Sequence, residues 1–200
     1  ENEDFAGQLY EHLASPSPKF SQGLVVNLPF TLIDSLIFIL EQPNPNALIM
    51  SKCLNCLVHF DKSIDLEFFE LFMRASPSIM DGITKVLKRC MYNIEIDHLT
   101  FEIFDSVIKF SDFVLKLCSA LNSEKPEDCS VLLVSLKESI LSFIIEHVGK
   151  WRFNSQNHRV RLLSEVCRLV LTLEKNNYVS STNFTLLNAI ISLVHDMNTE

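Results

Sequence analysis

Residues that interrupt helices are scarce in this 200-residue chain, which has only four glycines and seven prolines. Four of those prolines, Pro29, Pro45, Pro77 and Pro126, stand at the start of long apolar-periodic runs. Proline suits the first helical turn, because its missing N–H would be unpaired there in any case. The runs that follow contain almost no breakers, which indicates a stack of helices and predicts an all-α fold.

Positive charge and long apolar segments are also lacking. The chain has 17 Lys and Arg against 25 Asp and Glu, a net charge of −8, which argues against a general nucleic-acid binder. Asp34 interrupts the apolar residues 28–40, and Lys137, Glu138 and Glu146 interrupt residues 131–148. A bilayer-spanning helix needs about 20 apolar residues, so the sequence predicts no membrane span.

The cysteine pattern indicates the compartment. Two of the six cysteines lie three residues apart within one expected helix, which is not a disulfide framework. Free thiols predict a reducing compartment, the cytoplasm or the nucleus. The chain starts at Glu1 without a methionine or an apolar leader, so residues 1–200 are expected to be one all-helical domain of a larger intracellular protein.

Apolar periodicity places the helices. We expect them at 3–14, 28–41, 45–60, 65–74, 77–92, 97–121, 127–148, 157–175 and 182–197. Asn44, Ser76 and Asp97 are predicted N-caps, and Ser180, Ser181 or Thr182 can cap the last helix. The strand-like alternation at 93–97 is too short to outweigh these signals.

The polar residues of the expected helix 97–121 form one narrow stripe: Glu102, Asp105, Ser106, Lys109, Asp112, Lys116 and Ser119. Asp105 and Asp112 are interpreted as solvent-facing within it. Nearly all other positions are apolar, so the helix must be covered on two or more sides. Stacked layers of helix pairs satisfy that requirement, and so does a compact multi-helix bundle.

One stretch of the sequence is typical of a helical repeat. The Leu-rich run 32–40 ends in Glu41, a Pro-Asn-Pro-Asn turn follows at 43–46, and a second apolar run with small residues covers 47–58. This pattern resembles the armadillo/HEAT superfamily. The resemblance implies an α-solenoid segment of stacked antiparallel helices with a groove for peptides or helices, and it implies no catalytic residue.

Two constellations resemble metal sites, and neither is complete. Cys53, Cys56 and His59 share one expected helix, and no second Cys/His pair follows at the spacing that a tetrahedral zinc site needs. His195 and Asp196 resemble the dipeptide of helical phosphohydrolases but lack further ligands downstream. Gly-rich phosphate loops and nucleophile elbows are absent. The sequence predicts no metal, no cofactor and no enzyme.

The connector before the expected helix 157–175 holds the only tryptophan among basic residues, and Trp and Arg are enriched at binding hot spots. The predicted partner-binding residues are Lys150, Trp151, Arg152, Phe153, His158, Arg159 and Arg161. Their expected ligand is an acidic peptide or an amphipathic helix of a partner protein. In the alternative interpretation, the aromatic residues only close the gap between helices.

These patterns together predict a non-enzymatic scaffold or adaptor module that binds another protein in a complex. Three alternatives stay open. The chain can be a helical dimerisation or assembly domain, an all-α enzyme built from scattered polar residues, or a nucleic-acid-binding solenoid that uses the basic residues 150–168. The oligomeric state is not specified by the sequence.

Overall fold

The computed structural model describes residues 22–59, 66–90, 95–147, 152–153 and 155–175. The expected helices 3–14 and 182–197, with the caps at 180–182, lie outside the described residues. The elements are helices α2 (Gln22–Glu41), α3 (Ala47–His59), α4 (Leu66–Cys90), α5 (His98–Leu121), α6 (Pro126–Leu136), α7 (Ser142–His147) and α8 (Gln156–Lys175), the π-helix η2 (Lys137–Leu141), and strands β1 (Glu95–Ile96) and β2 (Arg152–Phe153). The all-α class is confirmed.

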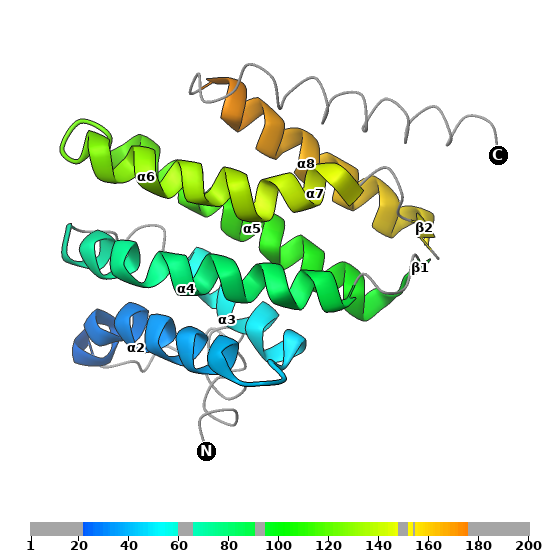
Figure 1. The fold of residues 1–200 in the computed structure, drawn as a ribbon, viewed down its shortest axis with the longest axis horizontal. Coiled ribbons are helices and arrows are strands. Elements are labelled where there is room, and N and C mark those ends of the chain that lie inside the picture. Colours follow the sequence, from blue (N-terminus) through cyan, green and yellow to red (C-terminus); the bar gives the residue numbers. More distant parts are fainter. Residues whose placement is uncertain (1–21, 60–65, 91–94, 148–151, 154, 176–200) are drawn as a thin grey trace.

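The helices form two layers (Figure 1). Helices α2, α4 and α6 follow one another across one layer, and α3, α5 and α8 across the other. The chain alternates between the layers. If α6, η2 and α7 are counted as one helical segment, each of these helices packs mainly on the helix two places along: α2 on α4, α3 on α5, and α5 on α8. Helix α5 also contacts α4 and α6 and is therefore covered on several sides, as its narrow polar stripe predicts.

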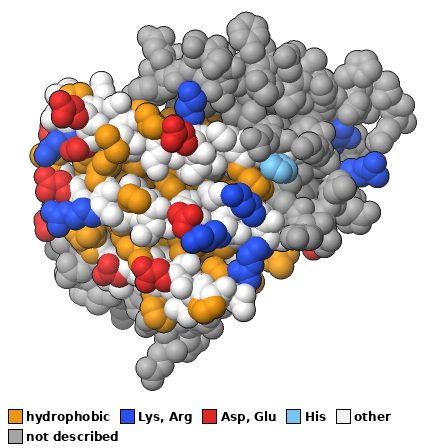
Figure 2. All heavy atoms as spheres, viewed as in Figure 1, with side chains coloured by type: hydrophobic (Ala, Val, Ile, Leu, Met, Phe, Trp, Pro, Cys, Tyr) orange, Lys and Arg blue, Asp and Glu red, His pale blue; other side chains and the backbone are white. Residues whose placement is uncertain are grey.

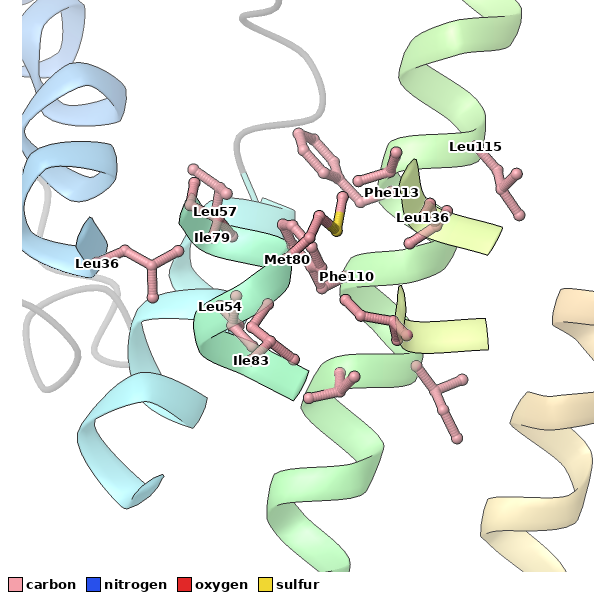
Figure 3. Packing of buried hydrophobic residues seen from close by; sticks show 14 of the residues in the cluster. Leu36, Leu54, Leu57, Ile79, Met80, Ile83, Phe110, Phe113, Leu115 and Leu136 are labelled. Atoms are coloured by element: carbon pink, nitrogen blue, oxygen red, sulfur yellow. The ribbon is translucent and has the colours of Figure 1, made fainter. Parts of the chain in front are cut away.

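The buried apolar side chains form one continuous cluster that includes residues of α2 to α8. Phenylalanine dominates where α4 crosses α5: the ring centroid of Phe72 lies 6.0 Å from that of Phe110 and 6.3 Å from that of Phe113. Figure 3 shows Leu54 of α3 and Ile83 of α4 in the same core. Edge-on and tilted aromatic pairs of this kind stabilise a core beyond their buried area.

Two of the four prolines do not start helices, and the prediction was wrong there. Helix α4 runs unbroken through Pro77, although two helices at 65–74 and 77–92 were expected. Pro77 has no N–H for the carbonyl of Met73, and the Ser76 hydroxyl donates to that carbonyl at 2.9 Å instead. Ser76 is therefore not an N-cap. Helix α2 likewise begins at Gln22, before Pro29.

The remaining helix starts follow local capping. Pro126 occupies the first turn of α6, and the Asp97 carboxylate accepts the backbone N–H of Thr100 at 2.7 Å, so both predictions are confirmed. Helix α3 begins at Ala47, after Pro45, because Asn46 supplies the cap. The expected cap Asn44 accepts a hydrogen bond from Arg89 of α4 instead, at 2.7 Å.

Two local features interrupt ideal packing. The expected helix 127–148 is continuous in path but widens into the π-helix η2, where the Ser142 hydroxyl donates to the carbonyl of Lys137 at 2.8 Å. At the crossing of α2 and α4, a Cβ atom built on Gly82 would lie only 2.7 Å from Cβ of Leu40. Glycine is required there because the two backbones approach too closely for any side chain.

The polar stripe of α5 is only partly open to solvent: Glu102, Lys116 and Ser119 are exposed, but its aspartates are buried. Asp105 and Asp112 are only 6% and 3% exposed, and Ser106 and Ser111 are fully buried. Ser106 lies against α3, where its hydroxyl is 2.7 Å from that of Ser51. The two aspartates pair with arginines of α8. The solvent-facing interpretation of Asp105 and Asp112 was therefore wrong.

Candidate functional site

A groove of about 620 Å³ follows the polar stripe of α5, with α3 on one side and α8 on the other; we call it the α5 groove. Its lining combines polar, charged and aromatic side chains from these three helices: Leu48, Ser51, Lys52, Asn55, Val58, His59, His98, Phe101, Glu102, Asp105, Lys109, Asp112, Lys116, His158, Arg161 and Arg168.

The groove depends on the alignment of α5 and α8, which run parallel. Strands β1 and β2 form a parallel pair immediately before the two helices, with Glu95 opposite Arg152 and Ile96 opposite Phe153. Both helices therefore begin at the same end of the groove. Ion pairs between them then recur at a constant sequence separation of 56 residues, which only parallel helices allow.

The first of these ion-pair clusters, the Asp105 rung, consists of Asp105, Lys109 and Arg161. Oδ2 of Asp105 accepts from Lys109 Nζ at 2.8 Å and from Arg161 Nη2 at 3.1 Å. Oδ1 of Asp105 is buried and has no hydrogen-bond partner among the described residues. One buried carboxylate thus holds two cationic side chains at the surface of the groove.

The second cluster, the Asp112 rung, consists of Asp112, Lys116, Arg168 and Glu165. Asp112 accepts from Lys116 Nζ at 3.1 Å and from Arg168 Nη1, while Nε and Nη2 of Arg168 donate to Glu165 at 3.0 and 2.8 Å. Partial burial lowers the pKa of Arg168, but the hydrogen bonds and charges of Glu165 and Asp112 outweigh it, and the pKa is raised. Every nitrogen of this guanidinium is engaged.

Aromatic rings occupy the end of the groove where α5 and α8 begin. The His158 ring stacks on Phe101 with centroids 4.4 Å apart and meets the His98 ring edge-on at 5.2 Å. The Arg161 guanidinium lies over Phe101, 5.6 Å from the ring centroid. His98 Nδ1 is 3.5 Å from a Glu102 carboxylate oxygen. Phe101 therefore fixes the positions of both His158 and Arg161.

The structure brings together only part of the predicted partner-binding set. His158 and Arg161 line the α5 groove, whereas Arg159 and the exposed Arg152 do not. The backbone of Phe153 is placed in β2, and Lys150 and Trp151 lie outside the described residues. Whether these residues bind a partner stays a prediction.

Of the residues in the two rungs, sequence reasoning assigned only Arg161 to a binding site and missed the other six, three of them acidic and three cationic. The available signal was their common spacing: Asp105 and Asp112, Lys109 and Lys116, and Arg161 and Arg168 are each seven residues apart. Seven residues are close to two helical turns, so the members of each pair share one helix face.

The lining of the groove has the opposite charge to the chain. Five cationic side chains, Lys52, Lys109, Lys116, Arg161 and Arg168, outnumber three acidic ones, so the lining carries +2 in a chain of net charge −8. Glu165, which pairs with Arg168 from outside the lining, reduces the surplus to +1. On the face made by α2, α4 and α6, acidic and basic side chains are interspersed with apolar patches (Figure 2). An anionic partner would be attracted to the groove.

A second hollow, of about 700 Å³, lies between the α2–α3 turn and α4. Of its three cations, Lys85 pairs with Asp81 of the same helix at 2.6 Å, and Arg89 donates to Asn44 of the α2–α3 turn at 2.7 Å; Lys88 is the third. The Arg89–Asn44 contact joins α4 to the turn, so we regard this hollow as structural.

The cysteine motif is part of the core. Burial raises the pKa of Cys53 to about 12, with a contribution from the neighbouring Cys56, and burial raises the pKa of Cys56 to about 11. Such thiols stay protonated at neutral pH, whereas zinc binds the thiolate. Within the described ranges no group of three or more His, Cys, Asp or Glu residues is arranged to hold a metal ion.

None of the described helices combines the length and apolar character that a bilayer crossing requires. No protein-family model, no curated protein and no solved structure matches this chain. The armadillo/HEAT resemblance therefore stays a prediction from the sequence pattern, and a functional proposal has to rest on the geometry of the α5 groove.

Proposed function

We infer that the chain is a non-enzymatic interaction module that binds an acidic segment of a partner protein in the α5 groove. The observation that carries this proposal is a lining of net charge +2, organised by two ion-pair rungs, in an otherwise acidic chain. Charge complementarity of this kind speeds encounter with an acidic partner and disfavours basic ones.

The rungs also hold the cationic groups in position before a partner arrives. Asp105 and Asp112 are buried and fixed in α5, and each holds one lysine of the same helix and one arginine of α8. Lysine and arginine side chains lose about 0.5–1.5 kcal/mol each of conformational freedom when a ligand immobilises them. Side chains that are already ordered lose less, so the rungs favour binding.

The width of the groove favours an extended segment over a helix. Helices pack with axes about 8–10 Å apart, so α3 and α8 on either side of α5 have axes at most about 20 Å apart. A helix with its side chains is about 10–12 Å across, which leaves at most about 10 Å between α3 and α8. An extended chain, which occupies about 5 Å between neighbouring strands, fits that space.

Contacts within each layer support the stacked-pair architecture of the armadillo/HEAT type. Ser51 meets Ser106 at a separation of 55 residues, Glu70 meets Lys125 at 55, and Asp105 meets Arg161 at 56, whereas the first pair, α2 and α4, has the shorter separation of 42 between Leu40 and Gly82. Successive units of similar length, each adding one helix to each layer, would produce this recurrence. A compact bundle is the alternative, because both arrangements enclose one continuous core.

The proposal is tested by selecting a displayed library of random peptides on the full chain. We expect the selected peptides to be rich in Asp and Glu, and to bind at least about tenfold more weakly to Arg161→Glu, a loss of about 1.4 kcal/mol. Arg152→Glu is the matched control, because Arg152 is exposed and lies outside the groove. Peptides without acidic enrichment, or equal losses in both variants, would refute the proposal.

A further inference from the structure

This inference rests on the proposed function and names the group that the groove recognises. We propose that the Asp105 rung is the subsite for a phosphorylated serine or threonine side chain of the bound segment. Phosphorylation of the partner would then control its binding to this chain.

Surplus positive charge is concentrated at this rung. Asp105 is the single carboxylate for Lys109 and Arg161, which leaves one positive charge uncompensated. At the other rung, Lys116 and Arg168 face two carboxylates, Asp112 and Glu165, and the charges balance. The Asp112 rung therefore holds the helices together, and the Asp105 rung retains the capacity to bind an anion.

Arg161 has the donors and the fixed orientation that a phosphate requires. Its side chain is 57% exposed, and one N–H of Nη2 donates to Asp105. Because Nη2 shares one edge of the guanidinium with Nε and the other with Nη1, its second N–H leaves one complete edge for a ligand. The guanidinium also lies over the ring of Phe101, with Cζ 5.6 Å from the ring centroid. A guanidinium with two donors on one edge binds phosphate oxygens in a bidentate manner.

The same contacts favour phosphate over carboxylate. Asp105 already offers Arg161 and Lys109 one carboxylate, so a carboxylate of a partner gains less at this rung than a phosphate of higher charge does. A phosphoserine carries about −1.5 to −2 charges and three acceptor oxygens. His98 and His158 supply further N–H groups at this end, where α5 and α8 also begin. Apart from Asp105, Glu102 is the carboxylate of the lining that would repel a phosphate at this end of the groove, and His98 lies beside it.

The direct test is an NMR titration of the isotope-labelled full chain at pH 7.5 and constant ionic strength. The two probes are N-acetyl-O-phosphoserine N-methylamide and N-acetyl-aspartate N-methylamide. We expect the phosphorylated probe to shift the amides around Phe101 and Arg161 and to bind at least tenfold more tightly. Equal affinity for the two probes, or no saturable shift, would overturn the subsite.

Variants locate the effect. Arg161→Gln should abolish the preference for the phosphorylated probe, Arg161→Lys should retain only part of it, and Arg152→Gln should leave it unchanged. Urea midpoints close to that of the unmodified chain show that each variant is folded. A preference that survives Arg161→Gln would overturn the assignment to this rung.

The subsite and the proposed function can fail separately. If selected acidic peptides lose affinity with Arg161→Glu but the two probes bind equally, the phosphate subsite is wrong and the acidic-segment proposal stands. If the phosphorylated probe binds at Arg161 while no acidic peptides are selected, the subsite stands, and unmodified acidic segments are not its ligand.

Discussion

The two rungs should contribute to stability in proportion to the burial of their carboxylates, and Asp112→Asn measures this. The substitution preserves the size of the side chain and one acceptor oxygen but removes the negative charge. Asp112 accepts hydrogen bonds from Lys116 and Arg168, and its side chain is only 4% exposed. The change therefore replaces two ion pairs by at most two hydrogen bonds from charged donors to a neutral amide oxygen, in a buried position.

The size of the effect lies between those of buried and exposed ion pairs. Removing one partner of a buried pair costs about 3–5 kcal/mol, whereas an exposed pair contributes about 0.2–1 kcal/mol. The buried Asp112 carboxylate with its more exposed partners falls between these limits. Lys116 and Arg168 are about half exposed, so water compensates part of their charge and about 2 kcal/mol is expected. In a domain of this size that lowers Tm by about 4–8 °C.

Asp81→Asn is the matched control for this experiment. Asp81 and Lys85 form the same i,i+4 pair in α4, but their side chains are 64% and 66% exposed. Exposed pairs of this kind contribute about 0.3–0.5 kcal/mol. Both variants are measured by urea unfolding at pH 7, followed by circular dichroism at 222 nm. A loss for Asp112→Asn no larger than that for Asp81→Asn would refute the reasoning.

Three further outcomes are expected. Gly82→Ala places a Cβ atom 2.7 Å from Cβ of Leu40 and should reduce the free energy of unfolding, measured in urea, by about 1–3 kcal/mol. An unchanged free energy would contradict this close approach. Ser76→Ala removes the donor to the Met73 carbonyl and should cost about 1 kcal/mol by the same assay, against nearly nothing for the exposed Ser78→Ala. Burial raises the pKa of Cys53 from 9.0 to about 12, so the contribution of the protonated thiol to stability is complete below pH 9 and declines between pH 9 and pH 12 by about 1.4 kcal/mol per pH unit. Cys53→Ala should therefore flatten the dependence of the urea midpoint on pH in this alkaline range. An unchanged dependence would contradict this.

The sequence predicted the start of a helix correctly where the residue that starts it acts within the same helix. Asp97 caps α5 and Pro126 begins α6, because each acts within one turn of its own helix. Pro77 misled because its effect depends on its neighbour: the Ser76 hydroxyl satisfies the carbonyl that proline leaves free, and α4 continues. A proline after serine therefore indicates a helix start less strongly than proline alone.

The candidate site was predictable only in part, for a different physical reason. His158 and Arg161 were expected at a binding surface from their composition, and the structure places them in the α5 groove. Asp105 and Asp112 were assigned to solvent because burying a carboxylate is unfavourable without a partner. Their partners, Arg161 and Arg168, lie 56 residues further along the chain. A periodicity read within one helix contains no information on what covers it.

The common spacing of seven residues narrows the problem but does not orient the helices. Parallel helices pair Asp105 with Arg161 and Asp112 with Arg168, whereas antiparallel helices of the same spacing would pair Asp105 with Arg168. The connection between α5 and α8 decides between these pairings. Helices α6 and α7 return the chain along the other layer, so α8 starts at the end where α5 starts. Two helices whose charged residues share a spacing of seven, and which are joined by one returning helical segment, are thus predicted to form a parallel ladder of ion pairs. Both the spacing of seven and a constant separation between the paired residues can be searched for in other helical sequences.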